Sequence, residues 1–295
     1  MWRKFRKHKA GMISLFLLTL IMLFILFAEF TAPYGENEIS EYIYAPPQIP
    51  RFIDEDGHFH LRPFVYGREA QFNLETGTIE WITDTSAKHH LAFFVKGAPY
   101  KFLGFTSDIH LFGVEGGKLF LLGTDDLGRD VFSRIIYGGR VSLIVAVATA
   151  LMSLGLGTLA GLLSGYFGGI FDLIIQRVVE LFLIVPNIPL GLALAAFLPP
   201  DMAPGLLMLA VAGVLTVTSW SSVARQVRGK TLAIRETSFV KAAISIGAST
   251  PRVLLKHVLP PIYPHLIVLA TLTIPQVILA ESGLSFLGFG IRPPM

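Results

Sequence analysis

The sequence predicts an all-α polytopic membrane protein with a small β-rich insert between its first two spans. Composition supports this fold class. Apolar residues make up 53% of the 295 residues and charged residues only 15%, whereas soluble domains average about 25% charged residues. The apolar residues also gather into runs long enough to cross a bilayer, which takes about 20 residues. Five such runs occur, at residues 11–30, 141–165, 170–198, 203–223 and 262–283.

The first apolar run follows a basic tail. A secretory signal peptide has the same order of charge and apolar core, but no cleavage site of the Ala-x-Ala kind follows this run. Lys and Arg concentrate on the cytoplasmic side of membranes. Residues 1–31 are therefore interpreted as a cytoplasmic tail and a retained first transmembrane helix. The basic residues of the tail are Arg3, Lys4, Arg6, Lys7 and Lys9.

The insert comprises residues 32–122. Between residues 33 and 140, 15 acidic residues stand against 10 Lys and Arg, so this segment lacks the basic excess of a cytoplasmic loop. Turn signals at residues 75–77, 96–97 and 116–117 bound short runs that are typical of strands, such as residues 90–95 and 118–122. We expect a small β-rich extracytoplasmic domain.

Metal and thiol chemistry have little support in the sequence. The chain contains no cysteine, which excludes disulfides and thiolate zinc sites. His58 and His60 would share one face of a strand, but two histidines do not make a zinc site. We expect ordinary surface histidines and no bound metal.

Residues 123–140 are predicted to form an interfacial helix that leads into the second span. Thr124 is a favourable N-cap residue, and Asp125 and Asp126 would then lie in the first turn, where the helix dipole favours negative charge. An apolar face would be formed further on by Val131, Phe132, Ile135 and Ile136.

Glycine spacing predicts close helix packing in the second span. Gly157, Gly161 and Gly165 recur every four residues, which lets another helix approach by backbone contact. The neighbouring helix belongs either to this chain or to a second membrane subunit.

The third apolar run contains charges and prolines. Arg177 and Glu180 lie one helical turn apart, and an ion pair within the helix is the favoured interpretation. Lining a solvated translocation path is the alternative, since ionisable residues within membranes are often functional. Pro186, together with Pro189, is expected to kink this span.

A second basic segment lies at residues 225–256, with seven Lys and Arg and Glu236 as its acidic residue. The positive-inside rule places it on the same side as the tail, which agrees with four spans between them. Residues 239–246 predict a short helix that Gly247 ends in a left-handed turn. Ser249 or Thr250 then caps a second helix, with Pro251 at its first position, which is expected to stop at Pro260.

The same segment resembles the EAA loop of binding-protein-dependent ABC importer permeases, which docks on the ATPase subunit. The match comprises Lys241-Ala242-Ala243, Gly247 four residues later, and His257-Val258-Leu259-Pro260, with Lys241 in place of the Glu that names the loop. The resemblance implies that ATPases dock at residues 239–260. The residues it implicates are Phe239, Lys241, Ala242, Ala243, Gly247, His257, Leu259 and Pro260.

Two further stretches narrow the resemblance. LGTDDLGRDVFSRIIYGG at residues 122–139 and ILAESGLSFLGFG at residues 278–290 are similar to the C-type permease of dipeptide and oligopeptide importers. This implies an ABC transmembrane type-1 permease fold over residues 141–295 in a bacterial or archaeal cytoplasmic membrane. It also implies a homologous second permease, two ATPases that use ATP and Mg, and an extracytoplasmic binding protein. The family has a further span after residue 290, so either the sequence is a fragment, which is the favoured interpretation, or this protein lacks the sixth helix.

Other functions have less support. A secondary, ion-coupled transporter would show inverted repeats, and no such symmetry is visible. A membrane-anchored receptor would not need five spans or the docking loop. Residues 229–231 end like a phosphate-binding loop but follow a membrane span, so we expect no ATP on this chain and no enzyme activity. Peptide is the favoured cargo; nickel and sugar-derived cargo stay open.

Overall fold

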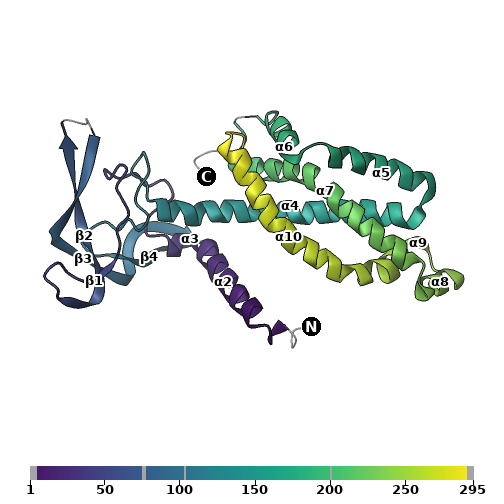
Figure 1. Ribbon diagram of the computed structural model, residues 1–295, viewed down its shortest axis with the longest axis horizontal. Coiled ribbons are helices and arrows are strands. Elements are labelled where there is room, and N and C mark those ends of the chain that lie inside the picture. The colour runs from purple at the N-terminus through teal and green to yellow at the C-terminus, as the bar shows by residue number, and fades with distance from the viewer. Residues whose placement is uncertain (1–4, 75–77, 103, 200, 291–295) are drawn as a thin grey trace. The chain divides into compact units, whose positions relative to one another are not determined.

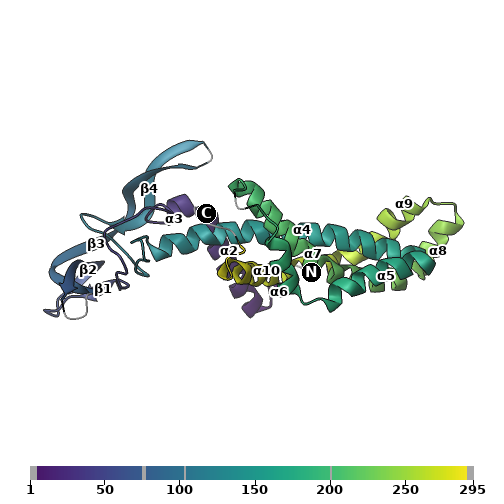
Figure 2. The ribbon, with the colours of Figure 1, turned by 90° about the horizontal axis from the view of Figure 1, so that it is seen from above.

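The computed structural model describes residues 5–74, 78–102, 104–199 and 201–290. The chain divides into two compact units, with the boundary between Arg140 and Val141. The first unit contains two helices, a sheet and the beginning of a long helix, and the second unit is helical (Figures 1 and 2).

The first helix of the first unit, α2 (Lys9–Leu26), is apolar on all sides, and each of its 18 residues lies at least partly at the surface. Such a helix suits a lipid environment. Its N-terminus is capped by His8, whose Nδ1 accepts a hydrogen bond from the Gly11 amide at 2.9 Å. The short helix α3 (Ala28–Thr31) follows, and its Glu29 accepts a hydrogen bond from Arg140 at 2.7 Å.

The insert contains a four-stranded antiparallel sheet in the order β1-β2-β3-β4. Its β-rich character is confirmed, and residues 90–95 lie in a strand as expected. The strands are β1 (Arg51–Ile53), β2 (Phe59–Asn73), β3 (Thr78–Phe102) and β4 (Phe105–Val114).

Two expectations for the insert were wrong, and one lies outside the described residues. Residues 118–122 are not a strand; they form a loop in which the Phe120 amide donates to Gln48 Oε1 at 2.7 Å. Residues 96–97 are not a turn but part of a register shift within β3. Gly97 is needed there because an added Cβ would lie 2.5 Å from the ring of His110. The turn expected at residues 75–77 falls outside the described residues.

The buried carboxylate of Asp54, directly after β1, links this strand to β2 and β3. Asp54 accepts hydrogen bonds from the His58 amide at 2.8 Å and from Lys88 Nζ at 2.8 Å, and its Oδ2 lies 2.9 Å from His60 Nε2. The hydrogen bond of His60, and then that of Lys88, holds the pKa of Asp54 well below its usual range. His58 precedes β2, so the two histidines do not share a strand face.

We predict that Asp54→Asn destabilises the sheet at neutral pH. Asp54 has a lowered pKa in the folded state, so its ionised form stabilises the fold above its ordinary pKa of about 3.9, and that contribution is lost as the pH falls further. The wild-type sheet should therefore loosen as the pH falls below about 4, whereas the variant should respond much less in that range. Hydrogen exchange of β2 and β3 amides measures both effects. Equal protection of the two proteins at pH 7 would contradict the prediction.

The long helix α4 (Val131–Phe167) begins later than expected. Thr124 does not cap it; Thr124 instead forms a bridge with Asp130. Asp130 is the capping residue, because its carboxylate accepts from the amide and the hydroxyl of Ser133 at 2.8 and 2.6 Å. Helical structure then continues without a break into the predicted second span, so residues 123–140 are not a separate helix.

The second unit contains the rest of α4 and the remaining helices (Figure 1). These are α5 (Gly169–Ile184), α6 (Asn187–Ala195), α7 (Pro204–Arg235), α8 (Ser238–Ser245), α9 (Thr250–Val253), the π-helical segment η1 (Leu254–Val258) and α10 (Leu259–Phe286). Two apolar clusters form its core. One contains Val227 and Ile262, and the other contains Leu215 and Val277.

Contacts between α4 and α7 show in which direction the chain runs through each of these helices. Helices α4 and α7 are parallel, since Thr149 bonds Ala212, Ser153 bonds Ser219, and Gly161 faces Ala224. The segment between two parallel helices must return the chain to the starting end.

That return is made by α5 and α6, which meet at a 91° bend. The expected kink is therefore a break in the helix at residues 185–186. Among the described residues, four helices are long and apolar enough to cross a membrane, and the number is five if the bent pair is counted as one span.

Candidate functional site

The segment after α7 folds as a helix–turn–helix. Helix α8 ends at Gly247, whose φ is +81°. The Gly247 amide donates to the Ile244 carbonyl at 2.9 Å, and the Ala248 amide donates to the Ala243 carbonyl at 3.1 Å. This pair of bonds is the Schellman arrangement, which requires a left-handed residue at the Gly247 position. Ser249 then precedes α9, and Pro251 occupies its second position, where a proline costs no helical hydrogen bond.

Four buried side chains hold this element on the ends of α7 and α10. Val240 and Ala243 of α8 face inward, as do Val253 of α9 and Val258 of η1. Val240, Val253 and Val258 belong to one apolar cluster, whose other buried members are Leu162, Val223, Val227, Ile262 and Leu269. The helix–turn–helix is thus part of the core of the second unit, and a force applied to it would reach both long helices.

The outer side of the element exposes both apolar and basic side chains. Phe239, Ile246 and Leu255 expose 47%, 85% and 60% of their surface. Ala242, between the first two, and Gly247, directly after Ile246, are also exposed. The basic side chains in the same segment are Lys241, Arg252 and Lys256. Exposed apolar side chains with charged neighbours are typical of a surface that binds another protein. We call Phe239, Lys241, Ala242, Ile246 and Gly247 the α8 surface.

Lys241, at the position where related loops carry Glu, has an acidic partner at the end of α7. Its Nζ lies 3.0 Å from Glu236 Oε2, and both side chains are exposed. The Lys241 ammonium, followed by the Arg235 guanidinium, holds the pKa of Glu236 below its ordinary value. An exposed pair of this kind adds little stability, so the charge of Lys241 stays accessible to a partner.

The second helix does not stop at Pro260. Helical structure runs from Thr250 through η1 and α10 to Phe286. The π segment explains this continuity, because the Leu259 amide bonds the Leu254 carbonyl, five residues back. A wider turn relieves the clash between a proline ring and the carbonyl four residues before it. His257, Leu259 and Pro260 are partly buried in this turn, so they position the element and contribute less surface than α8.

A polar network fixes the same end of the unit, and sequence reasoning missed it. Arg228 of α7 donates two bonds to Asp172 of α5, at 2.6 and 2.5 Å, and Ser164 of α4 bonds the same carboxylate. Arg235 donates to the carbonyls of Gly165 and Tyr166 at 2.9 and 3.2 Å, at the end of α4. An aspartate at the start of an apolar run was the available signal, but nothing in the sequence pairs it with an arginine 56 residues away.

The three glycines of α4 lie against α7. A Cβ added to Gly157, Gly161 or Gly165 would come within 2.6–2.7 Å of α7 atoms. Their neighbour is therefore a helix of this chain.

Arg177 and Glu180 form an ion pair at 2.9 Å within α5, with both side chains exposed. Pro186 precedes α6 at the break.

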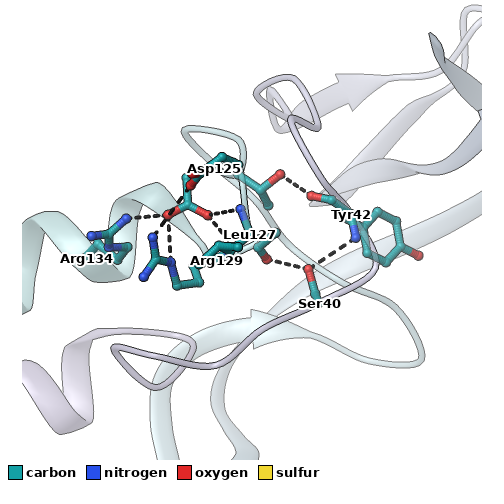
Figure 3. Close-up of polar contacts among 9 residues, drawn as sticks. Ser40, Tyr42, Asp125, Leu127, Arg129 and Arg134 are labelled. Atoms are coloured by element: carbon teal, nitrogen blue, oxygen red, sulfur yellow. Dashed lines mark hydrogen bonds and ion pairs between the residues drawn. The ribbon is translucent and has the colours of Figure 1, made fainter. Parts of the chain in front are cut away.

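The GTDDLGRD stretch forms an ordered loop in the first unit. Figure 3 shows the Asp125 carboxylate in contact with Arg129 and Arg134. Burial acts against ionisation, but the amides of Arg129 and Leu127 and the Arg129 side chain hold the pKa of Asp125 below its ordinary value. Ser40 Oγ donates to the Gly128 carbonyl at 2.5 Å, which ties the loop to the segment after the first helix (Figure 3).

Metal ligands come together at one place among the described residues. Asp54, Asp56 and His58 bring possible ligand atoms within 4.8 Å of one another. The Lys88 ammonium already forms an ion pair with the Asp54 carboxylate, and its positive charge disfavours binding of a metal cation there.

Two family models match the chain. Residues 157–295 match the model described as binding-protein-dependent transport system inner membrane component. Residues 1–47 match the model described as the N-terminal TM domain of oligopeptide transport permease C. The first match contains the helix–turn–helix, and the second contains α2 and α3.

Similar curated proteins are dipeptide and oligopeptide permeases. The dipeptide transport system permease protein DppC of Bacillus subtilis is 44% identical over 172 residues, which cover 58% of this chain and 52% of that protein. The oligopeptide transport system permease protein OppC of the same species is 38% identical over 59% of this chain and 55% of its own length. DppC of Lactococcus lactis is 28% identical over 99% of this chain and 75% of its own length. The chain thus spans about half the length of the first two relatives.

Proposed function

We propose that this chain belongs to the family of binding-protein-dependent transport system inner membrane components and is the permease subunit of an ATP-binding cassette importer for peptides or similar small solutes. The single observation that carries the proposal is the helix–turn–helix at residues 238–253. It is built into the core of the helical unit, yet it presents an apolar and basic outer side.

In this proposal the α8 surface docks on an ATPase subunit. ATP and Mg are used by two such ATPases, and a homologous second permease and an extracytoplasmic binding protein complete the importer. Closure of the ATPases moves α8. The shared apolar cluster passes the movement to α7, and the continuous helix through η1 passes it to α10. The chain has no need to bind ATP itself. Residues 229–231 lie within α7, so their backbone is helical and forms no phosphate-binding loop.

The proposal places the insert outside the cytoplasmic membrane and both basic segments inside. Cysteine substitutions test this, since the chain contains no cysteine. The Thr83→Cys variant should react with a membrane-impermeant thiol reagent in intact cells, because Thr83 is exposed on β3. The Lys230→Cys variant should react only after lysis. Reaction of both positions from outside would contradict this topology.

Co-purification and uptake test the function itself. The tagged chain, expressed with its genomic neighbours, should purify with an ATPase and a second permease in stoichiometric amounts. The purified assembly should take up peptide in proteoliposomes only with ATP and a binding protein. Purification of the chain alone, together with uptake driven by an ion gradient, would overturn the proposal.

A further inference from the structure

A polar hollow lies in the second unit beside the break between α5 and α6. Its volume is about 280 Å³, which is enough to hold several water molecules. This is close to the lower end of ligand-binding pockets, which start at about 300 Å³. Helices α7 and α10 form most of its wall, and the wall residues used below are Asn187, Ser222, Gln226, Thr273 and Gln276.

The polar groups of this hollow are neutral and still able to bond. Among the described residues, the side-chain amides of Asn187, Gln226 and Gln276 and the hydroxyl of Ser222 have no hydrogen-bond partner within the chain. Thr273 donates to the carbonyl of Leu269 at 2.8 Å, which leaves its oxygen free to accept. The hollow thus offers amide donors and acceptors together, and its lining carries no charged side chain.

These amides lie on helices that cross the membrane. Unpaired amides facing lipid are costly, so polar side chains within spans usually face a partner group or a water-filled cavity. The polar positions of α7 follow one stripe, with Ser222 and Gln226 one turn apart, and Thr273 and Gln276 form a matching stripe on α10. Two polar stripes that converge on a hollow suit a solvated ligand better than a lipid chain.

We propose that this hollow is a section of the translocation path, and that its neutral amides bond the backbone of peptide cargo whatever the charge of the cargo side chains. The inference rests on the proposed function. It places the path at Asn187, Gln226 and Gln276. The glycines of α4 are not on this path because they are buried against α7. The Arg177–Glu180 pair is not on it because this pair lies outside the hollow. A neutral lining neither attracts nor repels charged cargo, so this section should discriminate little between cationic and anionic peptides.

Charge substitutions test the inference. Uptake of Ala-Lys-Ala and Ala-Glu-Ala is measured in proteoliposomes with the full importer and saturating binding protein. Each variant's uptake ratio is divided by the wild-type ratio, which cancels the preference of the binding protein. The Gln226→Glu variant should raise the cationic-to-anionic ratio about tenfold, and Gln226→Lys should lower it by a similar factor, as expected for unit charges a few ångströms apart in a partly desolvated site. Gln276→Glu should act like Gln226→Glu.

The control is Gln71→Glu, which adds the same charge to an exposed position of β2 in the insert and should leave the ratio unchanged. Opposite shifts for Glu and Lys at residue 226 support the inference. Ratios within twofold of wild type for all three pocket variants, or equal loss of both peptides with normal assembly, would overturn it, and would indicate a contact with the second permease. Absence of peptide uptake by the wild-type importer would instead refute the proposed function.

Discussion

Gly161→Leu is expected to prevent the second unit from folding. A Cβ at this position would lie 2.6 Å from the Ala224 carbonyl oxygen and 2.9 Å from the Arg228 amide, both in the backbone of α7. Backbone atoms cannot move aside as a flexible side chain can, so α4 and α7 would have to separate. Overpacking of a core by a few methylene groups costs about 1–3 kcal/mol. A leucine against backbone is expected to exceed that range, and Gly161→Ala to fall within it.

Thermal unfolding and size-exclusion profiles in detergent measure this effect. The matched control is Gly155, on the same helix, where no described heavy atom lies within 4 Å of an added Cβ. Gly155→Ala should keep the wild-type Tm or raise it slightly, because glycine within a helix costs about 0.5–1 kcal/mol relative to alanine. A monodisperse Gly161→Leu protein with the wild-type Tm would show that α4 and α7 do not pack as described.

Gly247→Val should reduce transport severely while the protein still inserts in the membrane. The left-handed backbone at Gly247 costs a residue with a side chain about 1–2 kcal/mol, and a β-branched residue tolerates it least. A penalty of that size lowers the population of the correct turn by a factor of roughly 5–30. The turn sets the direction of α8, so the α8 surface would be displaced and uptake should fall by a similar factor. The effect is conformational, since no described heavy atom lies within 4 Å of an added Cβ.

The Gly247→Asn variant separates the backbone effect from the mere loss of glycine. Asparagine visits the left-handed region more readily than valine does, so this variant should keep most of the uptake. Both variants should retain the Tm of the wild type within a few degrees, because the side chain at this position is exposed. Normal ATP-driven uptake by Gly247→Val would contradict the role given to the turn.

Local chemistry made several features predictable from the sequence. The turn at Gly247 follows from the glycine itself and the helical pattern on either side. Glycines four residues apart on α4 indicated a close helix neighbour, although spacing on one helix does not identify α7 as that neighbour. The apolar runs indicated the spans because a bilayer selects for length and composition alone.

Features that depend on distant residues were missed. Thr124 is a favourable capping residue by type, but its hydroxyl accepts a hydrogen bond from the Ala45 amide. Asp130 caps α4 instead. Pro260 normally ends a helix, but the π turn before it keeps α10 continuous with α9. The ion pair of Asp172 with Arg228 required knowledge that α5 and α7 are neighbours at that end.

Site-specific cross-linking of the α8 surface to the ATPase tests the central claim most directly. Ala242 is exposed on α8, and a photoactivatable thiol reagent can be attached to the Ala242→Cys variant of this cysteine-free chain. Leu209→Cys, exposed near the opposite end of α7, is the control. The proposal predicts that Ala242→Cys cross-links to the ATPase in the assembled importer and that Leu209→Cys does not. Cross-linking from Leu209→Cys alone, or labelling of Ala242→Cys from outside intact cells, would contradict it.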